Sequence, residues 1–157
     1  MGTVFVGAFL IVYLILIFVS LAVGILDIIS YWKLFEKAGE PGWKSLIPFY
    51  NLFVITKIAT GRYTAATWIA VLTALYYILL ILVSITESVI LTLIAFLALI
   101  PVVVLSCYIY YQFGKAYGKS TGWCVAMIFL NQILIIAMGF DKDIVYTGPA
   151  SKNTELY

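Results

Sequence analysis

Histidine is absent from the 157 residues, charged residues make up only 10% of the chain, and cysteine occurs twice. Without histidine, the usual metal ligand and the usual proton-transfer group at neutral pH are both missing. Two cysteines, Cys107 and Cys124, are too few for a disulfide framework, and we expect them to be small apolar side chains within helices. The net charge of +2 is too small to indicate an acidic partner.

Apolar residues take the place of the missing charge. They make up 65% of the chain, whereas soluble domains are about 45–50% apolar and about 25% charged. A compact fold of this length could not bury so much apolar surface, so lipid must surround it. This excludes a cytosolic enzyme, a nucleic-acid-binding domain and a secreted disulfide scaffold. No basic segment precedes the first apolar run and no small-residue cleavage site ends it, which predicts a retained anchor.

Four uncharged stretches are long enough to cross a bilayer, which takes roughly 20 residues of helix. We therefore predict an all-α membrane protein whose four transmembrane helices form one domain over residues 1–140. The spans are expected at about 3–30, 64–86, 88–113 and 121–140, with a polar tail at 141–157.

A shorter apolar segment at 45–57 cannot cross the hydrocarbon region. Pro48 suits the first turn of a helix, where its missing N–H costs nothing. We predict an interfacial or re-entrant helix here, or a helix packed beneath the bundle.

The cations in the loops predict an orientation. A four-span topology places seven of the nine Lys and Arg on one face, and Lys142 and Lys152 on the other. Because Lys and Arg favour the cytoplasmic side, we expect the first loop and the 115–119 turn inside, and both termini outside. The seven are Lys33, Lys37, Lys44, Lys57, Arg62, Lys115 and Lys119.

The segment Lys37-Ala-Gly-Glu-Pro-Gly-Trp43 is rich in turn-forming residues. Gly39 is suited to end the first helix. Pro41 followed by Gly42 is typical of a type II turn, in which Gly42 would take a positive φ. We expect Trp43 to re-enter the membrane interface.

A similar sequence occurs later, at 113–123. It contains Lys115, Gly122 and Trp123, and an asparagine lies eight residues after each tryptophan, at Asn51 and Asn131. One interpretation is an internal repeat, which is common in transporters. The other is that membrane loops generally consist of lysine, glycine and tryptophan.

The segment 32–51, with its Lys-Ala-Gly-x-Pro-Gly-Trp and Ile-Pro-x-Tyr-Asn motifs, resembles the signature of a family of uncharacterised small bacterial inner-membrane proteins. The same module is similar to the membrane domain that precedes the catalytic domain of some bacterial type I signal peptidases. Phe113-Gly-Lys115 and Gly139-Phe-Asp141 agree with this resemblance, whereas the middle loop departs from it at Gly61-Arg-Tyr63. The resemblance implies a bacterial membrane module without an assigned activity.

Four polar side chains at membrane depth are candidate functional residues, since burying them is costly unless they find partners. For Asp27 we expect an interfacial ion pair, for instance with Lys33, and a role in a site is the alternative. Asn131 and Gln132 are expected to bond across helices or to bind a solute. Asn51 is expected to cap a helix or bond backbone, and solute binding is the alternative.

No catalytic, metal or cofactor site is predicted. Ser88 and Ser151 have no folded scaffold that would align them with Lys142 or Lys152. We expect a non-enzymatic module of the bacterial inner membrane whose partners are the lipid bilayer and a membrane protein or a second copy, not nucleic acid. A small-solute or ion transporter or channel, working as an oligomer, is the alternative.

Overall fold

The computed structural model describes residues 2–150, and this part of the chain contains helices, turns and loops but no strands. The predicted all-α class is therefore confirmed. The elements are α1 (Gly2–Lys37), η1 (Gly42–Leu46, a 3₁₀-helix), α2 (Pro48–Thr60), α3 (Thr64–Thr86), α4 (Val89–Ala116), α5 (Thr121–Phe129) and α6 (Asn131–Phe140).

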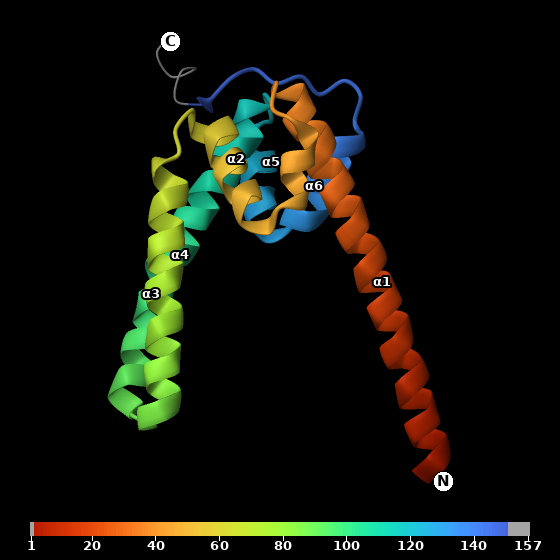
Figure 1. Cartoon of the computed structure of the whole chain (residues 1–157). Helices are drawn as coiled ribbons and strands as arrows, with labels where there is room; N and C mark the ends of the chain where they lie inside the picture. Colours follow the sequence, from red (N-terminus) through yellow and green to blue (C-terminus); the bar gives the residue numbers. More distant parts are fainter. Residues whose placement is uncertain (1, 151–157) are drawn as a thin grey trace.

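Three helices are long and apolar enough to cross a membrane: α1 from Phe9 onward, α3 and α4. This is the pattern of a membrane protein, because a helix satisfies its own backbone hydrogen bonds in lipid. In Figure 1, α1 forms one leg of the molecule and the antiparallel pair α3 and α4 forms the other. The legs meet in a compact helical cap, which we define as residues 30–60 and 109–150.

The prediction of one continuous helix over 121–140 is wrong. The chain breaks at Leu130 (φ −114°, ψ 33°) into α5 and α6, of nine and ten residues. The two helices form a hairpin, because Lys119 Nζ before α5 lies 3.7 Å from Asp141 Oδ2 after α6. Each is only about 15 Å long, so four spans are not confirmed.

The hairpin changes where the C-terminal segment lies. Residues 141–150 cross the top of the cap in Figure 1, beside the ends of α1 and α4. Thr147 N–H donates to Ala116 O at 2.9 Å, and Lys37 Nζ donates to Asp141 O at 2.5 Å. Lys142 therefore lies on the face of the other loop cations, contrary to the expected distribution, while Lys152 falls outside the described residues.

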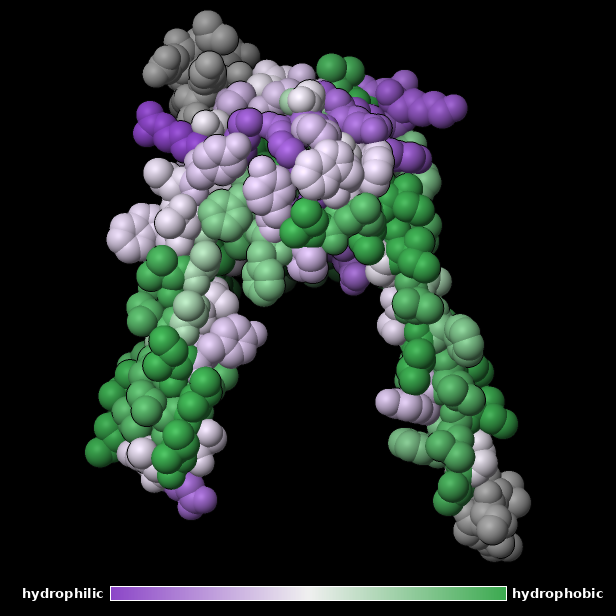
Figure 2. All heavy atoms as spheres, viewed as in Figure 1, coloured by the Kyte–Doolittle hydropathy of each residue, from purple (hydrophilic) through white to green (hydrophobic). Residues whose placement is uncertain are grey.

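The hydrophobic core lies in the cap and not between the legs. Its largest fully buried side chains come from every cap helix except η1, whereas no residue from 9 to 29 of α1 is buried. Figure 2 shows the same division, with hydrophilic residues over the cap and hydrophobic residues along both legs. The core includes Leu34, Phe35, Val54, Ile109, Phe113, Met127, Ile135 and Met138.

The two halves of the chain are arranged alike in the cap. α1 packs against η1, which follows it, and against α6; α4 packs against α5, which follows it, and against α2. Helices α1 and α4 end in the same motif, with Gly39 (φ 77°) after α1 and Gly118 (φ 68°) after α4 in the left-handed region. In each case this glycine and the next residue donate to the last turn of the helix. The arrangement favours the internal-repeat interpretation, with α3 as an additional helix.

Candidate functional site

The loop between α1 and α2 is fixed by glycine and tryptophan. Gly39 ends α1 as predicted, with its N–H donating to Glu36 O and the next N–H donating to Phe35 O. Gly42, however, does not take the positive φ of a type II turn and instead begins η1. A glycine is needed there for a different reason, because a Cβ on Gly42 would overlap the indole of Trp32.

Glu40, which follows Gly39, is held between two lysines. Its Oε2 lies 2.6 Å from Lys44 Nζ and its Oε1 accepts a short hydrogen bond from Lys57 Nζ, while only 11% of its side chain is exposed. Burial alone would raise the pKa of Glu40, but the hydrogen bonds from both lysines outweigh it and lower this pKa. The pKa of Lys57 is raised, chiefly by the same hydrogen bond and then by one with Tyr63.

A cavity of about 240 Å³ adjoins this cluster at the surface of the cap. Tyr146 forms one side of the cavity, and its hydroxyl donates to Ile58 O at 3.1 Å. Burial raises the pKa of Tyr146, against the opposing charge of Lys57. Glu40, which supplies the only carboxylate among the described lining residues, is already paired twice, so these residues offer hydrogen-bonding groups and no free base. Its lining is Ala38, Glu40, Lys57, Ile58, Gly61, Tyr146 and Pro149.

The second loop, between α4 and α5, is held in a comparable way. Ser120 caps α5, with its side chain accepting from Trp123 N–H at 3.4 Å. Lys115 Nζ donates to Thr121 Oγ1 at 2.8 Å, and Lys119 Nζ lies 5.0 Å from the centre of the Trp123 ring. The loop therefore presents cations that are already engaged with their neighbours.

The remaining residues of the two predicted motifs lie within helices or at their ends. Pro48 is in the first turn of α2, as predicted. Lys37 joins α1 to residue 141. Trp43 is half exposed on η1, and Gly122 is exposed with open space around it.

The four predicted polar residues are spread over three helices, α1, α2 and α6. Asp27 lies on the α1 leg with its Oδ1 buried, and the expected ion pair is not formed within residues 2–150. Lys33 Nζ lies 3.8 Å from the centre of the Phe140 ring instead. Asn51 and Asn131 lie in the first turns of α2 and α6, and Gln132 is exposed beside Asn131. Asn51 Oδ1 is buried without a hydrogen-bond partner among the described residues.

Two tyrosine contacts were missed by the sequence reasoning, a buried one at Tyr117 and a partly buried one at Tyr146. Tyr117 donates from its hydroxyl to Leu34 O at 2.6 Å, and burial raises the pKa of this hydroxyl. Tyr146 does the same for α2, as described above. A buried tyrosine hydroxyl requires a hydrogen-bond partner. A tyrosine next to a loop glycine, as in Tyr117-Gly118, is the one local sign that its hydroxyl bonds the backbone of a neighbouring helix.

Comparison with known families gives a match over residues 43–149 to a family of unknown function (DUF5684). The matched region begins at Trp43 and covers η1 through the segment that crosses the cap. No curated protein and no solved structure matches the chain. The resemblance to the membrane domain of type I signal peptidases therefore stays a prediction.

Proposed function

The chain belongs to this family of unknown function, and we propose that it is a non-enzymatic module of the bacterial inner membrane that binds the transmembrane helix of a partner through α1. The partner is another membrane protein or a second copy of the chain. One observation carries the proposal: between residues 9 and 29 no residue of α1 is buried against the rest of the described chain.

The exposure of α1 supports this role. From Phe9 to Ile29 it presents large apolar side chains, and Phe9 and Phe18 are 71% and 68% exposed. By contrast, α3 and α4 pack against each other along the second leg. Helix association in lipid depends on close packing and not on a hydrophobic driving force. A helix held rigidly by its cap end alone is positioned to receive another helix.

The orientation that we propose places the cap on the cytoplasmic side. Eight of the nine Lys and Arg lie at the cap end of the described chain, and Glu87 lies in the turn between α3 and α4, at the far end of that leg in Figure 1. The positive-inside preference then favours residues 141–150 inside, together with the loops. With three crossings, the two ends of the described chain lie on opposite sides.

Photo-crosslinking in intact membranes tests the association. We replace Phe9 or Phe18 with p-benzoylphenylalanine, and as a matched control Phe96 of α4, which is also 71% exposed. The proposal expects a discrete protein adduct on irradiation from α1 positions but not from Phe96. An adduct of twice the chain mass identifies a second copy, and any other mass identifies a different membrane protein.

Two results would overturn this proposal. Adducts to lipid alone at both α1 positions would show that no helix packs there. The same protein adducts from Phe96 would show random collision in the membrane and no specific surface.

Transport of a small solute or ion is the second candidate, because Asn51 and Asn131 lie in the first turns of the cap helices α2 and α6. The observation that favours it is that Asn51 Oδ1 is buried without a hydrogen-bond partner among the described residues. Flux through reconstituted protein that is abolished by Asn51→Leu or Asn131→Leu would support this candidate. Gln112→Leu on α4, whose amide bonds to Tyr108 at 3.0 Å, is the control that should leave flux unchanged.

A further inference from the structure

A gap lined by three lysines lies between α1 and the end of α6. It has a volume of about 500 Å³ and opens at the rim of the cap. Gly139 brings the two helices together beneath it, since a Cβ there would lie 2.5 Å from Ser30 Cα. The walls are therefore fixed by backbone packing. They are formed by Lys33, Glu36, Lys37, Gly139, Phe140, Asp141 and Lys142.

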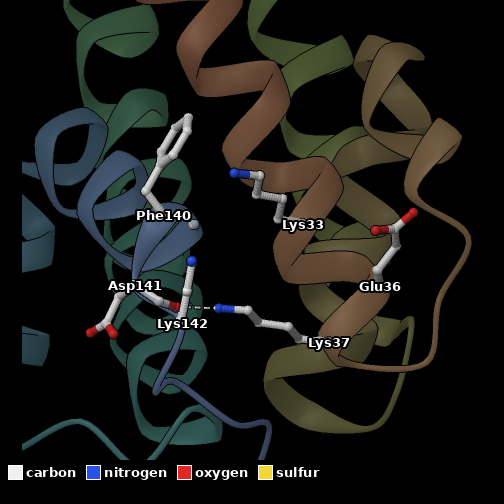
Figure 3. Close-up of a pocket in the computed structure, with 7 residues that line it drawn as sticks. Lys33, Glu36, Lys37, Phe140, Asp141 and Lys142 are labelled. Atoms are coloured by element: carbon white, nitrogen blue, oxygen red, sulfur yellow. Dashed lines mark hydrogen bonds between the residues drawn. The ribbon is translucent and has the colours of Figure 1, made fainter.

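The ammonium groups of this gap point inward and its carboxylates point outward. Figure 3 shows Lys33, Lys37 and Lys142 extending toward the space between the helices, whereas the Glu36 and Asp141 carboxylates turn away. Glu36 Oε1 accepts from Trp32 Nε1–H at 2.6 Å.

The Asp141 carboxylate accepts the Asp143 N–H at 3.0 Å and faces Lys119. Within residues 2–150, neither Lys33 nor Lys142 has a carboxylate within ion-pair distance. The gap thus gathers three ammonium groups, of which only Lys37 is influenced by the more distant charges of Asp141 and Asp143. Its one backbone acceptor, Asp141 O, is already bonded to Lys37.

The surface beneath the gap is apolar. One turn below Lys33, Ile29 is 38% exposed, and Leu26 and Ile25 continue the same side of α1 toward the bilayer. On the opposite wall the Phe140 ring is 46% exposed. A ligand that fits both parts has an anionic head at the level of the lysines and hydrocarbon below it.

We propose that this gap binds a phosphate anion, and that its occupant is the headgroup of an anionic phospholipid. Basic pockets beside transmembrane helices on the cytoplasmic side bind such headgroups, and lysine is a common phosphate ligand. A free phosphate ion would satisfy the lysines but leave the apolar strip below uncovered. The site does not depend on the association of α1 proposed above.

Native mass spectrometry of the full chain in non-ionic detergent tests the site. The probes are dioleoyl-phosphatidylglycerol, dioleoyl-phosphatidylcholine and inorganic phosphate, each titrated separately. The pocket variant is Lys33→Gln/Lys142→Gln, which keeps the Lys37–Asp141 hydrogen bond. The matched control is Arg62→Gln/Lys115→Gln, which removes the same charge outside the gap. Thermal unfolding of all three proteins verifies that they fold.

The expected result is that phosphatidylglycerol binds about tenfold more weakly to the pocket variant and changes less than about twofold in the control. Binding of inorganic phosphate as tightly as the lipid, with the same loss in the pocket variant, would keep the anion site and identify the free ion as its occupant. Equal losses in both variants, no loss in either, or equal binding of phosphatidylcholine would overturn the proposal.

Discussion

At the scale of single residues, the loop after α1 depends on a glycine at position 42, where no side chain fits. Gly42 lies against the Trp32 indole, with no room for a Cβ. Overpacking of this kind costs about 1–3 kcal/mol, so Gly42→Ala should lower the thermal unfolding temperature of the protein in detergent. Gly122→Ala is the control, because the space around Gly122 is open, and its unfolding temperature should not fall. An unchanged Gly42→Ala melt would mean that Trp32 moves aside freely.

A second residue, Glu40, makes the cap sensitive to acid. Its folded-state pKa lies below the ordinary value of 4.5 because Lys44 and Lys57 donate to it. Its contribution to stability is therefore complete above about pH 4.5 and is lost as the pH falls through the lowered pKa. We expect the unfolding temperature to fall more between pH 6 and pH 3 in the wild type than in Glu40→Gln. Parallel pH curves for the two proteins would contradict this.

At the scale of elements, the cap is held together where small residues let helices approach. Gly139 of α6 touches the α1 backbone at Ser30. Gly139→Ala should therefore separate α6 from α1 and cost about 1–3 kcal/mol, measured by unfolding in detergent. Gly24→Ala, which lies on α1 with open space around it, should stabilise the helix by up to about 1 kcal/mol. Equal effects of the two substitutions would contradict a close crossing at Gly139.

The elements also mark how far the sequence could predict this fold. The spans of α1, α3 and α4 follow from length and lack of charge, and the end of α1 follows from Gly39. The α5–α6 hairpin does not, because its 20 uncharged residues satisfy the same length criterion as a single span. The Asn131-Gln132 pair next to Leu130 was the local sign of a break, but amides also occur within continuous membrane helices.

The candidate sites were less predictable than the helices. Glu40 and its loop were identified as a motif, and Lys44 lies only four residues further on, but Lys57 reaches Glu40 only because α2 folds back toward the end of α1. The same holds for Lys33 and Lys142, which are more than 100 positions apart in the sequence. Such contacts depend on the tertiary packing of the cap and leave no local pattern.

At the scale of the whole molecule, the α5–α6 hairpin predicts three membrane crossings instead of four. With three crossings, a cysteine placed at Asp143 should react with a membrane-impermeant maleimide from the same side as one at Arg62, and from the opposite side to one at Glu87. All three positions are exposed, whereas Cys124 is buried. If Asp143→Cys reacted from the same side as Glu87→Cys, the result would contradict three crossings and support a four-span topology.

The division between a broad cap and slender legs has a mechanical consequence. The apolar rings of Phe49, in the first turn of α2, and Phe129, at the end of α5, are 86% and 82% exposed and match hydrocarbon rather than water. A cap embedded to the depth of these two rings displaces more lipid from one leaflet than three helices displace from the other. Such a wedge-shaped molecule has the lowest energy where the bilayer curves outward on its wide side, so local membrane curvature would govern where it gathers.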